Sequence, residues 1–132
     1  MTLLFLDDDC AALAPLGEAL GRHHGRLCDA WAAGWSPSHV RSEVRQVLEE
    51  EGVRSLGLVA RDPAAVPVDE VDVVIAFVSD EGKLRLRPGT RRVDWRLPHP
   101  ASAPPAERLE AYRAARDEIA RRLKDLLREI DP

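Results

Sequence analysis

The chain has 132 residues, of which 45% are hydrophobic and 32% are charged, a balance that excludes a disordered protein. At this length we expect a single domain, residues 1–132, built around one hydrophobic core. The formal net charge of -4 lacks the basic surplus that phosphate neutralisation requires, and no apolar run approaches the roughly 20 residues of a membrane span, so neither nucleic acid nor membrane is expected as a partner.

Two strands and two helices are predicted in the first half of the chain. Residues 2–6 form a short apolar run that ends in a turn signal, which is typical of a buried strand. Residues 15–24 fit a helix, because a proline suits its first turn and a glycine follows its end. A second strand is predicted over 27–33, and a Ser-Pro-Ser start signal predicts a second helix between 36 and 52.

The second half of the chain is predicted to hold two more strands and one long helix. Residues 53–70 contain two prolines and indicate a loop with at most one short helical turn. The run 71–78 is apolar enough for a central parallel strand, and 90–95 is typical of a further strand. After a stiff proline-rich loop, an amphipathic helix closes the chain, and we expect its Arg/Glu-rich face to be solvated. Its apolar face consists of Leu109, Tyr112, Ile119, Leu123, Leu126, Leu127 and Ile130.

The alternation of strands and helices favours an α/β fold. We expect three layers, α/β/α, around a parallel sheet of about four strands. In such sheets, ligands bind beyond the carboxyl ends of the strands, at the switch in strand order. The turn after the first strand, residues 7–14, is therefore the expected site, and its sequence DDDCAALA is unusually acidic.

Several short motifs, taken in order, resemble the low-molecular-weight protein tyrosine phosphatase family. The resemblance runs from residue 4 to about residue 127 and is greatest to the arsenate reductases built on that fold. It implies the fold of that family, with a phosphate-binding loop at 7–14. The motifs are LLFL, GEAL, AAGW, SEVRQVLEEEGV, VDVVIAF, RRVDW with LPHP shortly after it, and ERLEAYRAARDEIARRLKDLL.

The residues that carry the family's chemistry are replaced in this chain. The family's loop reads Cys-x5-Arg-Ser/Thr, in which a thiolate attacks the oxyanion that the arginine holds. An ungapped count places Asp7 at the position of the nucleophile, Leu13 at that of the arginine and Ala14 at that of the Ser/Thr. The family's general acid, an Asp before Pro, becomes His99 before Pro100. The further cysteines that arsenate reductases use in a disulfide relay have no counterpart in the stretch VSDEGKLRLRPG.

A free oxyanion is not expected to bind to this turn. Leucine cannot replace the bidentate grip of an arginine, and each Asp within about 4 Å repels a phosphate charge by roughly 4 kcal/mol at an effective dielectric constant of 20. A helix N-terminus contributes only about 0.3–1 kcal/mol in return. Cys10, three positions on, is an alternative nucleophile for a residual phosphatase or reductase, but without the arginine nothing obvious would lower its pKa.

A cation is the alternative ligand for the acidic turn. The pair LFLDDDC and VVIAFVSD also resembles the haloacid dehalogenase pattern, in which a strand ends in Asp-x-Asp and a later strand ends in Ser or Thr. That resemblance implies Asp7 as nucleophile, Asp9 as acid/base, Mg²⁺ bound by these two carboxylates, and Ser79 holding the phosphate. In a third interpretation, Asp7, Asp8 and Asp9 accept the backbone N–H bonds that a phosphate would otherwise receive, and no cofactor is needed.

The expected function is that of a catalytically degenerate phosphatase-like or arsenate-reductase-like protein that acts as a regulatory or protein-interaction module. Its degenerate loop, Asp8, Asp9, Cys10, Ala11 and Ala12, is the predicted ligand-binding segment. The resemblance implies that residues 7–14, 35 and 96–103 converge, and this surface is where a protein partner is expected. The sequence leaves a homodimer open.

The expected location is the cytoplasm. The first apolar run is far too short for the core of a signal peptide and ends in acidic residues. The two cysteines, Cys10 and Cys28, have no metal-binding spacing, and reduced thiols are the simplest state for them.

Overall fold

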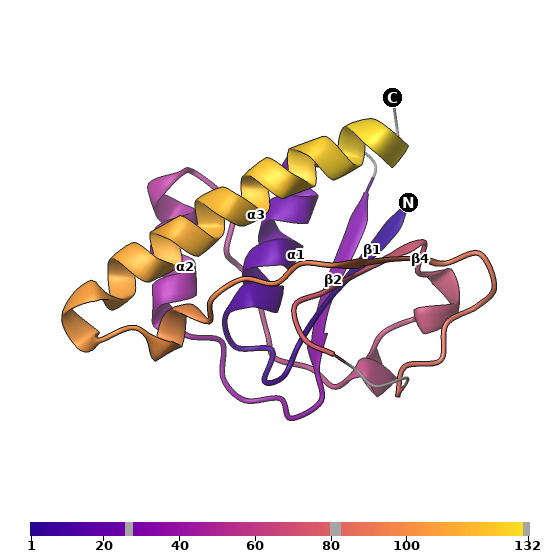
Figure 1. Ribbon diagram of the computed structural model, residues 1–132, viewed down its shortest axis with the longest axis horizontal. Helices are drawn as coiled ribbons and strands as arrows, with labels where there is room; N and C mark the ends of the chain where they lie inside the picture. Colours follow the sequence, from indigo (N-terminus) through magenta and orange to yellow (C-terminus); the bar gives the residue numbers. More distant parts are fainter. Residues whose placement is uncertain (26–27, 80–82, 131–132) are drawn as a thin grey trace.

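A four-stranded parallel sheet forms the centre of the computed structural model, which describes residues 1–25, 28–79 and 83–130. The strands lie in the order β2-β1-β3-β4, which places the two most apolar strands in the middle (Figure 1). The predicted α/β class and the predicted parallel sheet of four strands are confirmed. The strands are β1 (Thr2–Asp7), β2 (Asp29–Gly34), β3 (Val73–Ala76) and β4 (Arg91–Asp94).

The α-helices of the described residues pack on one face of the sheet, and the segment 63–71, which contains two short 3-10 helices, covers the other (Figure 1). The three predicted layers are confirmed, and residues of the segment 66–71 with the loop residues 84 and 86 form the second outer layer, whereas η3 and η4 pack against α3. None of the described helices is long and apolar enough to cross a membrane. The helices are α1 (Leu13–His24), α2 (Ser42–Glu50) and α3 (Arg108–Ile130), and the 3-10 helices are η1 (Pro63–Ala65), η2 (Val68–Glu70), η3 (Pro100–Ser102) and η4 (Pro105–Glu107).

Alternate residues of β1 face the two sides of the sheet, and residues 3–6 are fully buried. Leu3 and Phe5 pack with the α-helices, whereas Leu4 and Leu6 pack in the smaller core on the opposite face. Helix α1 approaches β1 closely at Gly17, where a Cβ atom would lie 2.2 Å from Cδ1 of Phe5. The absence of a side chain at Gly17 is therefore what lets the helix contact the strand.

The predicted start of α2 is wrong, because a contact distant in sequence competes with the local start signal. Helix α2 begins at Ser42 and not directly after the Ser-Pro-Ser start signal. The N–H groups of Ser36 and Ser38 donate to the carbonyl oxygens of Asp8 and Asp9, at 2.8 and 2.9 Å. These bonds attach the start signal to the loop after β1, so the helix begins only when the chain leaves that loop.

The remaining elements agree with the prediction in type. The strand predicted over 71–78 is shorter, and the strand predicted over 27–33 begins at residue 29, with residue 27 outside the described part of the chain. The loop predicted over 53–70, with at most one helical turn, contains two 3-10 turns, η1 and η2, so that part of the prediction is wrong.

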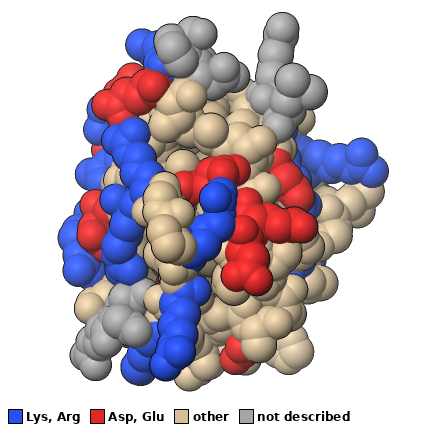
Figure 2. Space-filling view, turned by 90° about the vertical axis from the view of Figure 1, so that its right-hand side faces the viewer, with Lys and Arg blue, Asp and Glu red and all other residues tan. Residues whose placement is uncertain are grey.

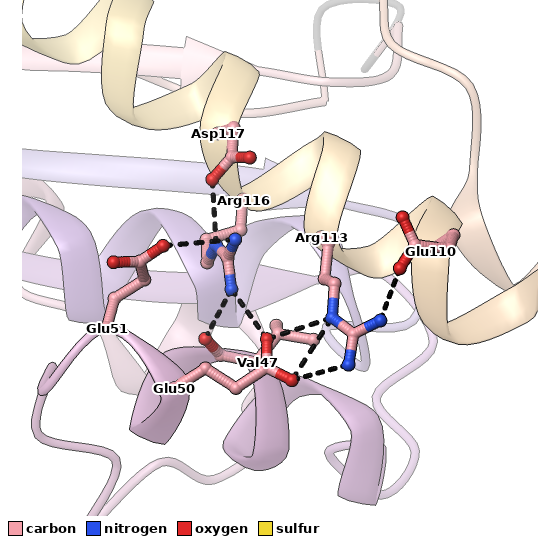
Figure 3. A network of polar contacts seen from close by, with 7 residues as sticks. All are labelled: Val47, Glu50, Glu51, Glu110, Arg113, Arg116 and Asp117. Atoms are coloured by element: carbon pink, nitrogen blue, oxygen red, sulfur yellow. Dashed lines mark hydrogen bonds and ion pairs between the residues drawn. The ribbon is translucent and has the colours of Figure 1, made fainter.

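The charged face of α3 is not wholly solvated, contrary to expectation. Arg116 is only 6% exposed, and its Nη1 donates to Oε1 of Glu50 and to the carbonyl oxygen of Val47, each at 2.9 Å (Figure 3). Arg113 adds a second ion pair to Glu50, with Nη2 and Oε2 2.7 Å apart. Because these partners satisfy the buried guanidinium, the network fixes α3 against the end of α2.

Candidate functional site

The loop between β1 and α1, residues 7–14, lies beyond the carboxyl end of a central strand. The strand order reverses between β1 and β3, so this loop occupies the switch point at which α/β sheets bind ligands. Gly34, the last residue of β2, supports the loop from the side. A Cβ atom there would lie 2.6 Å from the amide nitrogen of Cys10 and 2.8 Å from the carbonyl oxygen of Asp8. The backbone of the loop therefore lies directly against β2.

The Asp7 carboxylate spans the loop from within. The side chain is 1% exposed, and its Oδ1 accepts the backbone N–H of Cys10 at 2.5 Å. Its Oδ2 accepts the backbone N–H of Ala14 at 2.8 Å, in the first turn of α1. Asp9 makes a shorter-range bond of the same kind, from the N–H of Ala11 at 3.1 Å. Two of the three consecutive aspartates therefore serve as hydrogen-bond acceptors for their own loop.

Burial dominates the electrostatics of Asp7. Desolvation raises the pKa of this carboxyl from 3.8 to about 7, since the charged form loses its water. The two backbone N–H bonds lower the pKa, and the neighbouring charges of Asp9 and Asp8 raise it. A buried carboxyl with this pKa is half protonated near neutral pH, so its charge is sensitive to pH in the physiological range.

Cys10 is buried in the main hydrophobic core and does not face solvent. Its exposure is 0%, and burial raises the pKa of its thiol to about 12. Its φ of 51° lies in the left-handed region that non-glycine residues seldom adopt. The N–H bond to Asp7 holds this conformation. Among the five residues predicted to bind a ligand, Cys10, Ala11 and Ala12 are thus internal.

Two other positions implied by the family resemblance, 13 and 99, lie in different surroundings. Leu13, where the arginine was expected, is 3% exposed and packs in the main core. His99 precedes η3, and its Nδ1 accepts the N–H of Ala101 at 3.2 Å. His99 lines an apolar cavity of about 590 Å³ against α3, and no residue of the loop 7–14 lines that cavity.

The geometry provides no clustered metal site in the described residues. No group of three His, Cys, Asp or Glu side chains there is arranged to hold an ion. Both oxygens of Asp7 already accept backbone N–H groups, and Asp9 uses one oxygen in the same way. Each Asp7 oxygen keeps a second lone pair, but the side chain is 1% exposed, so an ion could reach it only if the loop opened.

A buried ion pair beside the loop was not predicted. Glu18 of α1 is 1% exposed, and its Oε1 accepts the N–H of Ala32 at 3.0 Å and pairs with Nη1 of Arg61 at 2.5 Å. The guanidinium of Arg61 also lies 5.3 Å from the ring centroid of Trp31. A charged residue inside the apolar stripe of α1 was the available signal for Glu18. Nothing in the local sequence distinguishes Arg61 from other loop arginines.

Trp35 follows β2 and packs on the face of the sheet opposite the α-helices. It contacts the smaller core together with Leu84 and Leu86. The ammonium of Lys83 lies 5.8 Å from its ring centroid. The Trp35 ring therefore packs at the edge of the smaller core.

Comparison with known proteins shows what this chain is similar to in fold. The sequence matches no family model and no curated protein. An arsenate reductase in its phosphate binding state shares 21% identity over 98% of both chains, with a TM-score of 0.78. The arsenate reductase of Archaeoglobus fulgidus shares 23% identity over 95% of this chain and 98% of that chain, with a TM-score of 0.77. The low-molecular-weight protein tyrosine phosphatase of T. tengcongensis shares 19% identity over 98% and 99%, with a TM-score of 0.80.

These similarities confirm the fold that the sequence motifs imply. The chain has the fold shared by low-molecular-weight tyrosine phosphatases and arsenate reductases, over essentially its whole length.

Proposed function

We propose that the chain is a catalytically inactive protein built on the low-molecular-weight phosphatase and arsenate reductase fold, and that it acts as a regulatory or protein-interaction module. The proposal includes no metal and no cofactor. The observation that carries it is the position of the Asp7 carboxylate. This carboxylate accepts the backbone N–H groups of Cys10, in the loop, and of Ala14, in the first turn of α1. Backbone N–H groups at the N-terminus of a helix are the donors that an anion would otherwise use.

The remaining loop chemistry supports the same proposal. A thiolate is the reactive form of cysteine, and a pKa of about 12 leaves almost no thiolate on Cys10 near neutral pH. Leu13 supplies no cation and is buried. His99 accepts a backbone N–H bond in its own turn and lines a separate cavity. A buried thiol, a leucine in place of a cation and a histidine that lines another cavity together support the proposal of inactivity.

Turnover is the first measurement. We expect no hydrolysis of an aryl phosphate and no reduction of arsenate by the purified chain, with or without magnesium. Magnesium-dependent turnover that Asp7→Asn abolishes would overturn the proposal in favour of a metal-assisted hydrolase. Turnover that thiol alkylation abolishes would overturn it in favour of Cys10. Peptide mass spectrometry after iodoacetamide treatment should find Cys10 unmodified in the folded protein and modified after denaturation.

Unfolding tests the filled loop directly. Asp7→Ala removes the internal acceptor and leaves the buried N–H groups of Cys10 and Ala14 without partners, so it should lower the free energy of unfolding by about 1–3 kcal/mol. Asp8→Ala is the matched control, because Asp8 is exposed and its removal takes away the same charge without removing those bonds; it should cost less than about 0.5 kcal/mol. Equal losses in urea unfolding would show that the loop does not depend on Asp7 as its internal acceptor.

A further inference from the structure

The two edges of the sheet differ in how their backbone groups are satisfied. At β2, the residues whose N–H groups point away from β1 are all capped: Ala30 by Oδ1 of Asp29, Ala32 by Oε1 of Glu18, and Gly34 by the carbonyl oxygen of Arg61. Two outward carbonyl oxygens are capped as well. That of Ala30 accepts from Arg22 at 2.8 Å, and that of Ala32 accepts from Arg61 at 3.2 Å. The β2 edge is closed to a further strand.

The β4 edge has no comparable cover among the described residues. The N–H groups of Arg91 and Trp95 donate inward to β3, to the carbonyl oxygens of Asp72 and Ala76. By the alternation of a strand, the N–H and carbonyl groups of Asp94 therefore point outward. No backbone hydrogen bond joins Asp94 to another described segment on that side. Three of the four β4 residues are exposed, so this edge is open to water and to a partner strand.

The open edge lies within a strongly basic segment, which we call the basic strip: Lys83, Arg85, Arg87, Arg91, Arg92 and Arg96. Between Lys83 and Arg96 the sequence has one carboxylate, Asp94, although the whole chain carries a net charge of -4. Asp80 and Glu81, just before the strip, lie outside the described residues. Figure 2 shows Lys and Arg side chains gathered in a band on the side of the molecule where β4 lies, beside a separate group of Asp and Glu side chains.

The side chains of the basic strip are exposed to water. Arg87, Arg91 and Arg92 form ion pairs, but every side chain in those pairs is between 30% and 61% exposed, so water and salt weaken them. Lys83, Arg85 and Arg96 form no ion pair within the described part of the chain. The strip therefore holds more positive charge than the carboxylates of the described residues neutralise in ion pairs.

We propose that the β4 edge binds an extended acidic segment of another protein, which adds a strand beside Asp94 while its carboxylates pair with the basic strip. Backbone hydrogen bonds along an open edge supply affinity, and side chains on either side of the added strand supply specificity. This inference deepens the interaction role proposed above and rests on it, because it gives that role a surface and a partner chemistry.

Charge decides which occupant fits. A second copy pairing through the same edge would bring two basic strips together, and like charges placed opposite each other destabilise strand pairs. Nucleic acid would use the cations but not the outward N–H and carbonyl groups of the edge. An acidic polypeptide uses both features, and it is the occupant that the edge and the strip together favour.

The test is binding of a fluorescein-labelled peptide of alternating glutamate and valine, followed by fluorescence anisotropy at low and high salt. A lysine–valine peptide tests the charge. The glutamate–valine peptide N-methylated at alternate residues tests strand pairing at constant charge. We expect the acidic peptide to bind, the basic peptide not to bind, and the methylated peptide to bind about tenfold more weakly.

Two charge-reversal variants locate the site. Arg85→Glu/Arg96→Glu alters the basic strip, whereas Arg54→Glu/Lys124→Glu makes the same total change at exposed residues outside it. The first should weaken binding of the acidic peptide by about tenfold or more, and the second by less than about twofold. Circular dichroism and melting curves verify that both variants fold.

The outcomes separate cleanly. Equal weakening by the two variants, equal affinity for the methylated peptide, or no binding of the acidic peptide would overturn the inference. Tighter binding of a single-stranded polynucleotide than of the acidic peptide would also overturn it, in favour of nucleic acid. Turnover of an aryl phosphate would refute the proposed inactivity and leave the peptide-binding result standing.

Discussion

Replacing Asp7 by asparagine should change how the stability of the protein depends on pH. In the unfolded chain the Asp7 carboxyl titrates near 3.8, whereas in the folded protein burial raises its pKa to about 7. Between these two values the folded state binds a proton that the unfolded state has released. The free energy of unfolding must therefore fall as pH rises through this window, and it levels off above it. Asparagine does not titrate, so the variant lacks this contribution.

The size of the effect follows from the shift. A pKa difference of about three units corresponds to about 4 kcal/mol, at 1.36 kcal/mol per unit. Asp7→Asn also carries a cost that is independent of pH, because the asparagine amide can accept only one of the two N–H groups and its NH₂ faces the other donor. That mismatch costs about 1–3 kcal/mol. The variant should thus be the less stable protein at pH 4 and should recover relative to the natural protein by about 4 kcal/mol at pH 8.

Urea unfolding at a series of pH values between 4 and 8 measures this difference. Asp69→Asn is the control, since Asp69 is exposed and its removal should shift the curve by a constant small amount. If the natural protein and Asp7→Asn give parallel curves, the folded pKa of Asp7 lies near 3.8. The two backbone N–H bonds would then outweigh burial, and the reasoning from desolvation would be refuted.

Two further substitutions, each with a control, test the packing of α1 on β1 and of α3 on α2. Gly17→Ala should lower the free energy of unfolding by about 1–3 kcal/mol, because its methyl group would overlap the ring of Phe5. Gly21→Ala is the control and should cost clearly less, since a methyl group there would lie 3.3 Å from its nearest neighbours. Equal losses in urea unfolding would contradict the argument. Arg116→Met should lower the free energy of unfolding by about 1–3 kcal/mol, because the contacts of Arg116 with α2 are lost. Arg121→Met, at a side chain that is 63% exposed, should change it by less than about 0.5 kcal/mol. A similar cost for both would show that burial of Arg116 does not matter.

Sequence reasoning succeeded where one local pattern decides the structure. The central strands β1 and β3 are continuous apolar runs, and only a strand buried on both faces needs such a run. The apolar stripe of α3 likewise predicts its buried residues, among them Tyr112 and Ile119. The acidic turn suggested that an aspartate would accept backbone N–H bonds, and Asp7 does so.

The failures share a physical cause, which is competition from residues distant in sequence. The start of α2 is delayed because Ser36 and Ser38 bind carbonyl groups of the loop after β1. Arg116 is buried because α2 supplies a carboxylate and a carbonyl group that the sequence of α3 cannot reveal. Arg61 reaches Glu18 across 43 positions in the chain. The periodicity of hydrophobic residues predicts which face of an element is buried, but it does not identify partners that are distant in the sequence.

The arrangement of the loop explains why single substitutions should not restore the chemistry of similar folds. A thiol at position 7 would meet the two N–H donors that the carboxylate now satisfies, but no cation would then hold an oxyanion. An arginine at position 13 would have to leave the hydrophobic core in which Leu13 is 3% exposed. Cys10 would need to emerge from full burial before its thiolate could form. The proposed inactivity therefore predicts that no single one of these substitutions produces turnover, and the proposed interaction role is tested at the β4 edge.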